Sequence, residues 1–414
     1  MSMNHLSADA VVIGGGAAGC MCAVMAAENG KQIVLLEPNR QLGRKLRITG
    51  KGRCNVTNQC DIKRVMENMP GDGRFLFSAL NAFPPEQVMD FFKDAGVSLK
   101  TERGNRVFPV SDNANDIADA LSNLINKRNV TVIHEKAVNI ELDNGMVSKV
   151  ITKNTEIDTN CCAICTGGLS YPKTGSDGSG YLLAENLGHV IADCHPSLVP
   201  LESDDKCCQQ LQGLALKNVK ITAMEDGRAI FREQGEMLFA HFGVTGPIVL
   251  SASAHMRNFG KAQYIIEIDF KPALDDDTLE KRVLRDFDKY KNKSIGNALV
   301  DLLPHAMIPV MLNRMGVPRA KPVHEITKQE RKSLIHLLKH FSISISGTRP
   351  FDEAIITAGG VKTIDINPRT MESKIVQGLF FAGEIMDLDA YTGGFNLQIA
   401  WSTGFVAGKT ISNR

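Results

Sequence analysis

The chain has 414 residues, of which 43% are hydrophobic and 22% are charged, as in a globular protein of two or three domains. Its 47 Lys and Arg residues nearly balance 46 Asp and Glu residues, which argues against nucleic-acid and anionic-membrane partners. No run of 18 apolar residues occurs and no signal peptide is evident, so we expect a cytoplasmic protein. Ten cysteines without separated C-x2-C pairs predict reduced thiols and no metal site.

The first 37 residues predict a β-α-β unit. Residues 9–13 form a short β-branched run, residues 20–28 favour a helix, and residues 33–36 form a second apolar run. Continuous apolar runs of this kind are typical of parallel strands that are buried on both faces. We therefore expect an α/β domain at the start of the chain.

A G-x-G-x-x-G pattern lies between the first predicted strand and helix. It consists of Gly14, Gly16 and Gly19, with Ala17 and Ala18 before the last glycine. Gly14 permits a tight turn, Gly16 lets backbone N–H groups approach a pyrophosphate, and Gly19 lets helix and strand pack closely. Glu37 ends the next strand, where it can accept hydrogen bonds from an adenosine ribose. The pattern predicts a dinucleotide site that either NAD or FAD could fill.

The C-terminal segment favours FAD. An apolar strand over residues 378–382 ends in Gly383-Glu384, and a glycine-rich stretch at 392–396 precedes a helix predicted from Leu397. A strand-end acid can hold the ribityl hydroxyls of a flavin, and a helix N-terminus can stabilise charge at the flavin N1–C2=O edge. NAD-dependent enzymes need no such distant element. An ordinary capped helix after a turn is the alternative interpretation.

The middle of the chain changes character after about residue 190. Strand patterns appear at residues 220–222 and 264–268, and helical patterns follow at residues 277–291 and 327–341. This order predicts a separate insert with a strand part and a helical part.

Residues 40–53 carry six basic residues, no acidic residue and three glycines, and we predict a cationic, flexible loop. Arg44 and Lys45 are candidates to neutralise the FAD diphosphate. Lys51 or Arg53 is a candidate to stabilise reduced flavin or an anionic substrate. A solvated loop is the alternative for about half of the six.

Several motifs together resemble the YhiN-like flavoproteins, a bacterial family that includes aminoacetone-oxidase-like and bile-acid-inducible proteins. The motifs are residues 14–19, 43–46, 52–58, 166–172, 235–247, 357–361, 383–387 and 394–396, and they span nearly the whole chain. The resemblance implies an α/β protein in which a two-dinucleotide-binding-fold domain holds FAD. That domain is expected at residues 1–190 and 355–414. The insert, residues 191–354, is expected to hold a small β-barrel (191–272 and 342–354) and a helical part (273–341).

The resemblance also implies positions for the parts of FAD. The diphosphate is assigned to residues 14–19, the ribose to Glu37, the adenine to backbone near Val138, the ribityl chain to Glu384, and the flavin ring to Asn396 and Leu397. Thr166, Gly167, Gly383 and Gly394 lie in the matching motifs and are expected to contact the cofactor. Two positions depart from the family pattern: Phe395 stands where a tyrosine is frequent, and Lys51 stands where glycine is common.

His241 is the first candidate for catalysis, because its motif at residues 239–247 resembles a family element near the flavin and its imidazole titrates near neutral pH. Lys51 is the second candidate. A structural role for His241 is the alternative. Cys54 invites comparison with flavin disulfide reductases, but Cys60 is six residues away, so we expect a plain buried or semi-exposed thiol and leave a redox role open.

The leading interpretation is an FAD-dependent oxidoreductase that transfers a hydride between flavin N5 and a small organic substrate bound between the FAD domain and the insert. Substrate, reaction direction and oligomeric state stay open. Two alternatives are a nicotinamide-only dehydrogenase and an FAD-binding RNA-modification or scaffold protein with a structural cofactor. Because only one G-x-G-x-x-G turn is present, we expect weak NAD(P)H binding and either direct substrate oxidation or a partner reductase.

Overall fold

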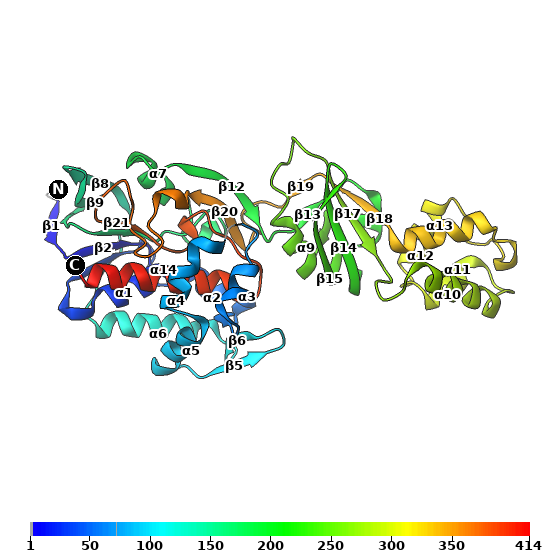
Figure 1. Cartoon of the computed structure of the whole chain (residues 1–414), viewed down its shortest axis with the longest axis horizontal. Coiled ribbons are helices and arrows are strands. Elements are labelled where there is room, and N and C mark those ends of the chain that lie inside the picture. The colour runs from blue at the N-terminus through cyan, green and yellow to red at the C-terminus, as the bar shows by residue number, and fades with distance from the viewer. Residues whose placement is uncertain (1–2, 72) are drawn as a thin grey trace. The chain divides into compact units, whose positions relative to one another are not determined.

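The computed structural model describes residues 3–71 and 73–414 and divides the chain into two compact units (Figure 1). The first unit comprises Met1–Ser197 and Phe351–Arg414, and the second comprises Leu198–Pro350. Strand β12 (Ile191–Ser197) pairs antiparallel with β20 (Ile356–Val361), which places it in the first unit and not in the insert expected from residue 191.

A five-stranded parallel sheet forms the centre of the first unit. Its order is β21 (Leu379–Phe381), β11 (Cys162–Ile164), β2 (Ala10–Ile13), β3 (Ile33–Leu36) and β7 (Thr131–Ile133). Every residue of the four strands β21, β11, β2 and β3 is buried, which explains their continuous apolar sequences. The predicted β-α-β unit is confirmed.

Helix α1 (Ala17–Ala26) joins β2 to β3 and packs against α14 (Phe395–Ser412), as Figure 1 shows. Two glycines of α14 permit this close contact. A Cβ atom at Gly404 would lie 2.5 Å from the carbonyl oxygen of Ala18, and one at Gly408 would lie 2.4 Å from that of Cys22. The last helix of the chain therefore completes the core around the first.

Smaller elements complete the first unit. One sheet consists of β1 (Asn4–Ser7), β10 (Thr155–Asp158), β9 (Met146–Thr152) and β8 (Ala137–Asp143), and another of β4 (Thr57–Asn58), β6 (Arg106–Pro109) and β5 (Leu99–Glu102). The remaining helices are α2 (Arg44–Gly52), α3 (Ile62–Glu67), α4 (Phe77–Ala82), α5 (Pro85–Asp94), α6 (Ala114–Lys127) and α7 (Ser179–Asn186). The prediction of a flexible loop at residues 40–53 is wrong, because most of that segment forms α2.

A seven-stranded antiparallel sheet forms the strand part of the second unit. Its order is β18 (Phe341–Ile345), β17 (Tyr264–Asp269), β14 (Ala215–Glu225), β15 (Arg228–Ala240), β16 (Gly243–Thr245), β13 (Leu201–Glu202) and β19 (Gly347–Thr348). The two edge strands, β18 and β19, are separated by one residue, Ser346. The sheet must therefore curve until its edges are neighbours, as in a barrel.

The helices of the second unit are α8 (Lys206–Gln210), α9 (Pro247–Ser253), α10 (Asp276–Lys289), α11 (Ile295–Ala298), α12 (Met307–Met315) and α13 (Lys328–Lys339). Asp275 caps α10, and Thr327 with Glu330 forms the predicted capping box of α13. Among the described residues, no helix has both the length and the apolar character needed to cross a bilayer.

Candidate cofactor and substrate site

A cavity of about 910 Å³ lies in the first unit at the carboxyl ends of four parallel strands. Its wall includes Ile13–Gly16 after β2, Leu36–Asn39 after β3, Cys165–Gly167 after β11 and Ala382–Glu384 after β21. Ligands of open α/β sheets bind at this edge, because the connecting loops and helix N-termini converge there. The volume suits a large organic ligand.

The glycine-rich turn forms one wall of the cavity with backbone atoms. Gly14 has a φ of 103°, and a Cβ there would lie 2.6 Å from the carbonyl oxygen of Cys165. A Cβ at Gly19 would lie 1.8 Å from the carbonyl oxygen of Gly14, so this position needs glycine for packing. A Cβ at Gly16, by contrast, would meet no atom within 4 Å.

The N-terminus of α1 faces the cavity without a side-chain cap, since its N-cap residue is Gly16. Ala17 and Ala18, in its first turn, line the cavity. Free N–H groups and the positive end of the helix dipole favour an anion at this position. The geometry fits the diphosphate predicted for this turn.

Glu37 is buried, and its carboxylate accepts three hydrogen bonds. Oε2 accepts from the Gly15 amide at 2.8 Å, and Oε1 accepts from the backbone and side-chain amides of Asn39 at 2.9 and 2.7 Å. Arg44 in turn donates to the Asn39 side chain. Glu37 therefore positions the glycine-rich turn, and its contact with a ribose stays a prediction.

The start of β8 and the two residues before it line the same end of the cavity. Glu135, Lys136 and Ala137 are among the lining residues, whereas Val138 is not and its side chain is 55% exposed. The contact of an adenine with backbone near Val138 stays a prediction. A hydrogen bond from the Thr152 hydroxyl lowers the pKa of Glu135, so this carboxylate is ionised at neutral pH.

Two buried polar atoms of lining residues have no partner in the described structure: the hydroxyl oxygen of Thr166 and the side-chain carbonyl oxygen of Asn55. Gly167 follows Thr166 with a φ of 73°. Buried polar groups are nearly always hydrogen-bonded. Both atoms are shielded from the accessible surface of the cavity, so they belong to the packed wall behind it.

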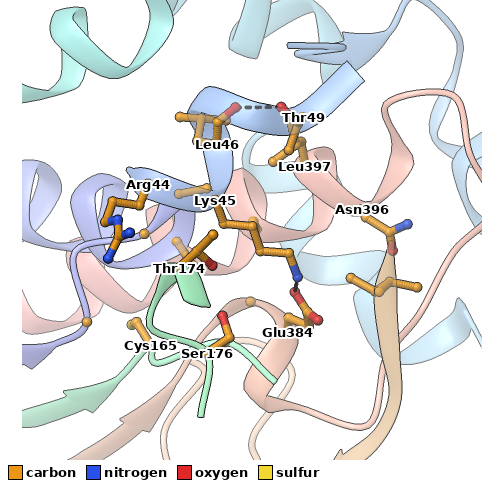
Figure 2. A pocket seen from close by; sticks show the side chains of 18 of the residues that line it. Arg44, Lys45, Leu46, Thr49, Cys165, Thr174, Ser176, Glu384, Asn396 and Leu397 are labelled. Atoms are coloured by element: carbon orange, nitrogen blue, oxygen red, sulfur yellow. Dashed lines mark hydrogen bonds and ion pairs between the residues drawn. The ribbon is translucent and has the colours of Figure 1, made fainter. Parts of the chain in front are cut away.

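Glu384 and Lys45 form an ion pair on another wall (Figure 2). Nζ of Lys45 lies 2.6 Å from Oε2 of Glu384, while Oε1 accepts from the hydroxyl of Ser170 at 2.8 Å and the amide of Thr357 at 3.0 Å. Gly383 brings this strand end to α1, since a Cβ there would lie 2.7 Å from that of Ala18. Lys45, expected at the diphosphate, is thus paired at the position expected for the ribityl chain.

The N-terminus of α14 also faces the cavity without a side-chain cap. The helix begins at Phe395, two residues before the predicted start, and its N-cap residue Gly394 has a φ of 97°. Asn396 lines the cavity, but its amide donates to the Ala390 carbonyl at 2.6 Å and accepts from the Ala390 amide at 2.9 Å. Asn396 therefore fixes the preceding loop, and Leu397 lines the cavity beside it.

Arg53 and Lys51 differ in their surroundings, although both line the cavity. The Arg53 guanidinium lies 2.5 Å from carboxylate oxygens of both Glu102 and Asp112 and 4.2 Å from the Phe108 ring centroid. Hydrogen bonding to Arg53 lowers the pKa of Glu102, as expected for a neutralised pair. Lys51 lies in the kinked last turn of α2 with a φ of 59°.

His241 lies in the second unit, at the exposed turn between β15 and β16, with its ring edge-on to Phe242 at 5.1 Å. No residue of this turn is among those that line the cavity, and the role of His241 stays a prediction. Cys54 is fully buried, which raises its pKa to about 12. A protonated, buried thiol is unreactive.

Sequence reasoning assigned no role to several residues that line the cavity. They are Thr49, Asn55, Asn58, Arg64, Asn68, Arg106, Ser176 and Tyr391. Three of them, Thr49, Asn58 and Arg106, come from α2, β4 and β6. The motif at residues 52–58 was the available signal for Asn55 and Asn58.

Comparisons with known proteins agree with this geometry. The family model described as HI0933-like protein Rossmann domain matches residues 8–410. The chain is 28% identical over 410 residues to a 3-dehydro-bile acid delta(4,6)-reductase of Clostridium scindens, covering 97% of this chain and 98% of that protein. It is 29% identical over 405 residues to a ribosomal RNA dihydrouridine synthase of Escherichia coli, with the same coverage of both chains.

Solved structures show the same fold. A 3-ketosteroid-delta4-(5alpha)-dehydrogenase from Rhodococcus jostii has a TM-score of 0.52 at 16% identity, covering 99% of this chain and 97% of that one. The FrdA chain of E. coli quinol fumarate reductase has a TM-score of 0.53 at 15% identity, covering 99% of this chain and 71% of that one.

Proposed function

This chain belongs to the HI0933-like family of FAD-dependent oxidoreductases, and from that premise we propose that it reduces a carbon–carbon double bond conjugated to a carbonyl group. Two relatives that match over nearly their full length support this reaction. The name of one describes removal of the 4,6 double bonds of a 3-oxo bile acid. The name of the other describes saturation of the uracil ring, whose double bond is likewise conjugated to a carbonyl. The shared chemistry favours reduction over amine oxidation.

The residues of the cavity fit FAD at both ends. Gly16 leaves open space beside the uncapped N-terminus of α1, which suits the diphosphate. Bound FAD supplies hydride transfer at flavin N5.

The structural observation that supports flavin chemistry in this cavity is the uncapped N-terminus of α14 at Gly394. Its N–H groups and the positive end of the helix dipole stabilise negative charge at this wall, which is the charge that reduction places on the N1–C2=O edge of a flavin. Asn396 holds the loop before this helix in place through Ala390. The wall therefore suits the reduced state of a flavin, through which both reduction and oxidation of a substrate pass, and the proposed direction rests on the two relatives.

A uracil base within RNA is a second candidate substrate, because a relative from E. coli and one from Haemophilus influenzae, 29% and 28% identical, are ribosomal RNA dihydrouridine synthases. The expectation of no nucleic-acid partner rested on net charge alone. Both candidates require the same reaction at the same flavin.

The test is anaerobic reoxidation of the reduced holoenzyme. We expect a conjugated cyclic enone, uridine or unmodified ribosomal RNA to restore the oxidised flavin spectrum with saturable kinetics, while the saturated ketone has no effect. Formation of dihydrouridine in the RNA would select the second candidate. Reoxidation by none of these compounds, together with bleaching of oxidised enzyme by an amine, would overturn the proposal.

A further inference from the structure

Positive charge gathers at one end of the cavity, formed by α2, α3, β4, β6 and the loop before α14, which we call the α2 end. Its lining residues include the cations Lys45, Lys51, Arg53, Arg64 and Arg106, against the single carboxylate Glu384. Helix α2 begins beside the glycine-rich turn, because the Gly43 amide donates to the Gly15 carbonyl at 2.8 Å, whereas Lys51 lies in the last turn of this helix.

Two of these five cations are neutralised by carboxylates. Lys45 pairs with Glu384 at 2.6 Å, and Arg53 pairs with Glu102 and Asp112 at 2.5 Å each. The charges of Lys45 and Arg53 are therefore balanced by carboxylates of the chain. Lys51, Arg64 and Arg106 remain.

The remaining three cations are free to meet a ligand. Arg64 lies 3.6 Å from Glu67 on the same helix, a solvent-exposed pair of small value. Nε of Arg106 donates to the Arg103 carbonyl at 3.0 Å. Within the described parts of the chain, neither Arg106 nor Lys51 has a carboxylate within ion-pair distance.

The backbone at Lys51 is in the left-handed region, which is strained for a residue with a side chain. Its φ of 59° follows one of 56° at Gly50, and this left-handed region suits glycine. The family resemblance places a common glycine at this position. Residues with strained backbone dihedrals occur most often at active sites and ligand-binding sites.

The α2 end is held rigid by Asn58. Its side-chain amide donates to the carbonyls of Gly104 and Gly393, each at 3.0 Å. These two bonds tie the turn that carries Arg106 to the loop before α14. Arg106 is therefore fixed near the wall where the flavin ring is expected.

We propose that the substrate carries an anionic group, a carboxylate or a phosphate, which Lys51 and Arg106 bind with Arg64 at the α2 end. This inference rests on the proposed function, since it names the class of conjugated carbonyl compound that the site accepts. Two or three charge-assisted hydrogen bonds would orient the double bond over the flavin. A small carboxylic acid and a nucleotide both supply the required anion.

The experiment compares charged and neutral probes of one shape. Binding of 3-oxocyclohexane-1-carboxylate and of its methyl ester to the oxidised holoenzyme is followed by perturbation of the flavin spectrum. A second pair, uridine 5′-monophosphate and uridine, tests phosphate as the source of the anion. In at least one pair we expect the anion to bind about tenfold more tightly, with affinity falling as salt rises.

Variants assign the effect to residues. Lys51→Gly and Arg106→Met should each remove most of the preference for the anion, and Lys51→Arg should retain it. Lys127→Gln, on the exposed end of α6, is the matched control and should behave as wild type. FAD content measured in each variant separates loss of cofactor from loss of anion binding.

The outcomes separate this inference from the proposed function. Equal affinity of both members of each pair, or no effect of Lys51→Gly, would overturn the anion site even if enones reoxidise the flavin. A salt-sensitive preference for the anion without reoxidation by any conjugated carbonyl would uphold the anion site and overturn the proposed reaction. No spectral change with either anion would also overturn the anion site.

Discussion

At the glycine-rich turn the cavity wall is backbone, whereas at the α2 end it is charged side chains. The turn lies within residues 14–19, and short hydrogen bonds from the Gly14 amide to the Leu36 carbonyl and from the Gly15 amide to the Glu37 carboxylate hold it to the next strand. At the α2 end, Lys45 meets Glu384 and Asn58 meets Gly393, over more than 300 residues of sequence. A local motif can bind the diphosphate of a cofactor, whereas the site expected for the flavin ring is formed only when distant segments of the chain come together.

The sharpest test of this contrast lies within the turn. Gly19→Ala should destabilise the apoprotein by about 1–3 kcal/mol, because its Cβ would lie 1.8 Å from the Gly14 carbonyl oxygen. Gly16→Ala should leave apoprotein stability unchanged but weaken FAD about a hundredfold or more, because its Cβ would occupy the space of the diphosphate. Thermal unfolding and FAD titration measure both. Equal behaviour of the two variants would contradict this division of roles.

Glu37→Ala should weaken FAD about tenfold to a hundredfold, the value of one charge-assisted hydrogen bond of roughly 1.5–3 kcal/mol. The structure adds a second cause, since the carboxylate also holds Gly15 and Asn39. Isothermal titration of the apoprotein with FAD is the measurement. Glu86→Ala, on the exposed side of α5, is the control. Affinity equal to that of wild type would remove Glu37 from the cofactor site.

At the α2 end, Lys45 and Glu384 should show energetic coupling. Their side chains are 21% and 13% exposed, so Lys45→Met or Glu384→Gln alone leaves a charge with little solvent and should cost about 1–3 kcal/mol. The double variant should cost less than the two single costs together. Urea unfolding of all four proteins gives the coupling energy. Additive costs would show that the two side chains act independently.

The smallest expected effect has the opposite sign. Lys51→Gly should stabilise the apoprotein by about 1 kcal/mol, because it relieves a left-handed residue whose φ is 59°. Gly50→Ala, at a φ of 56°, should destabilise it. Urea unfolding compares the two variants. A loss of stability in Lys51→Gly would mean that the lysine supports the fold and not the site.

The same contrast explains what could be predicted from sequence. The β-α-β unit and the glycine-rich turn were predictable because their residues are neighbours in the chain. Helix α2 was missed because three glycines and six basic residues concealed its short helical pattern. The partner of Lys45 lies 339 residues away, and no local pattern encodes such a pair. Arg106 was missed for the same reason.

The first unit draws its core from both ends of the chain, since α14 packs along α1 and β21 pairs with β11. The second unit is continuous, from Leu198 to Pro350. During synthesis the ribosome therefore releases the whole second unit before the last strand and helix of the first exist. Until residues 379–412 emerge, α1 lacks its contact with α14 and β11 lacks its pairing with β21, so part of the apolar core of the first unit stays exposed while the second unit can already fold.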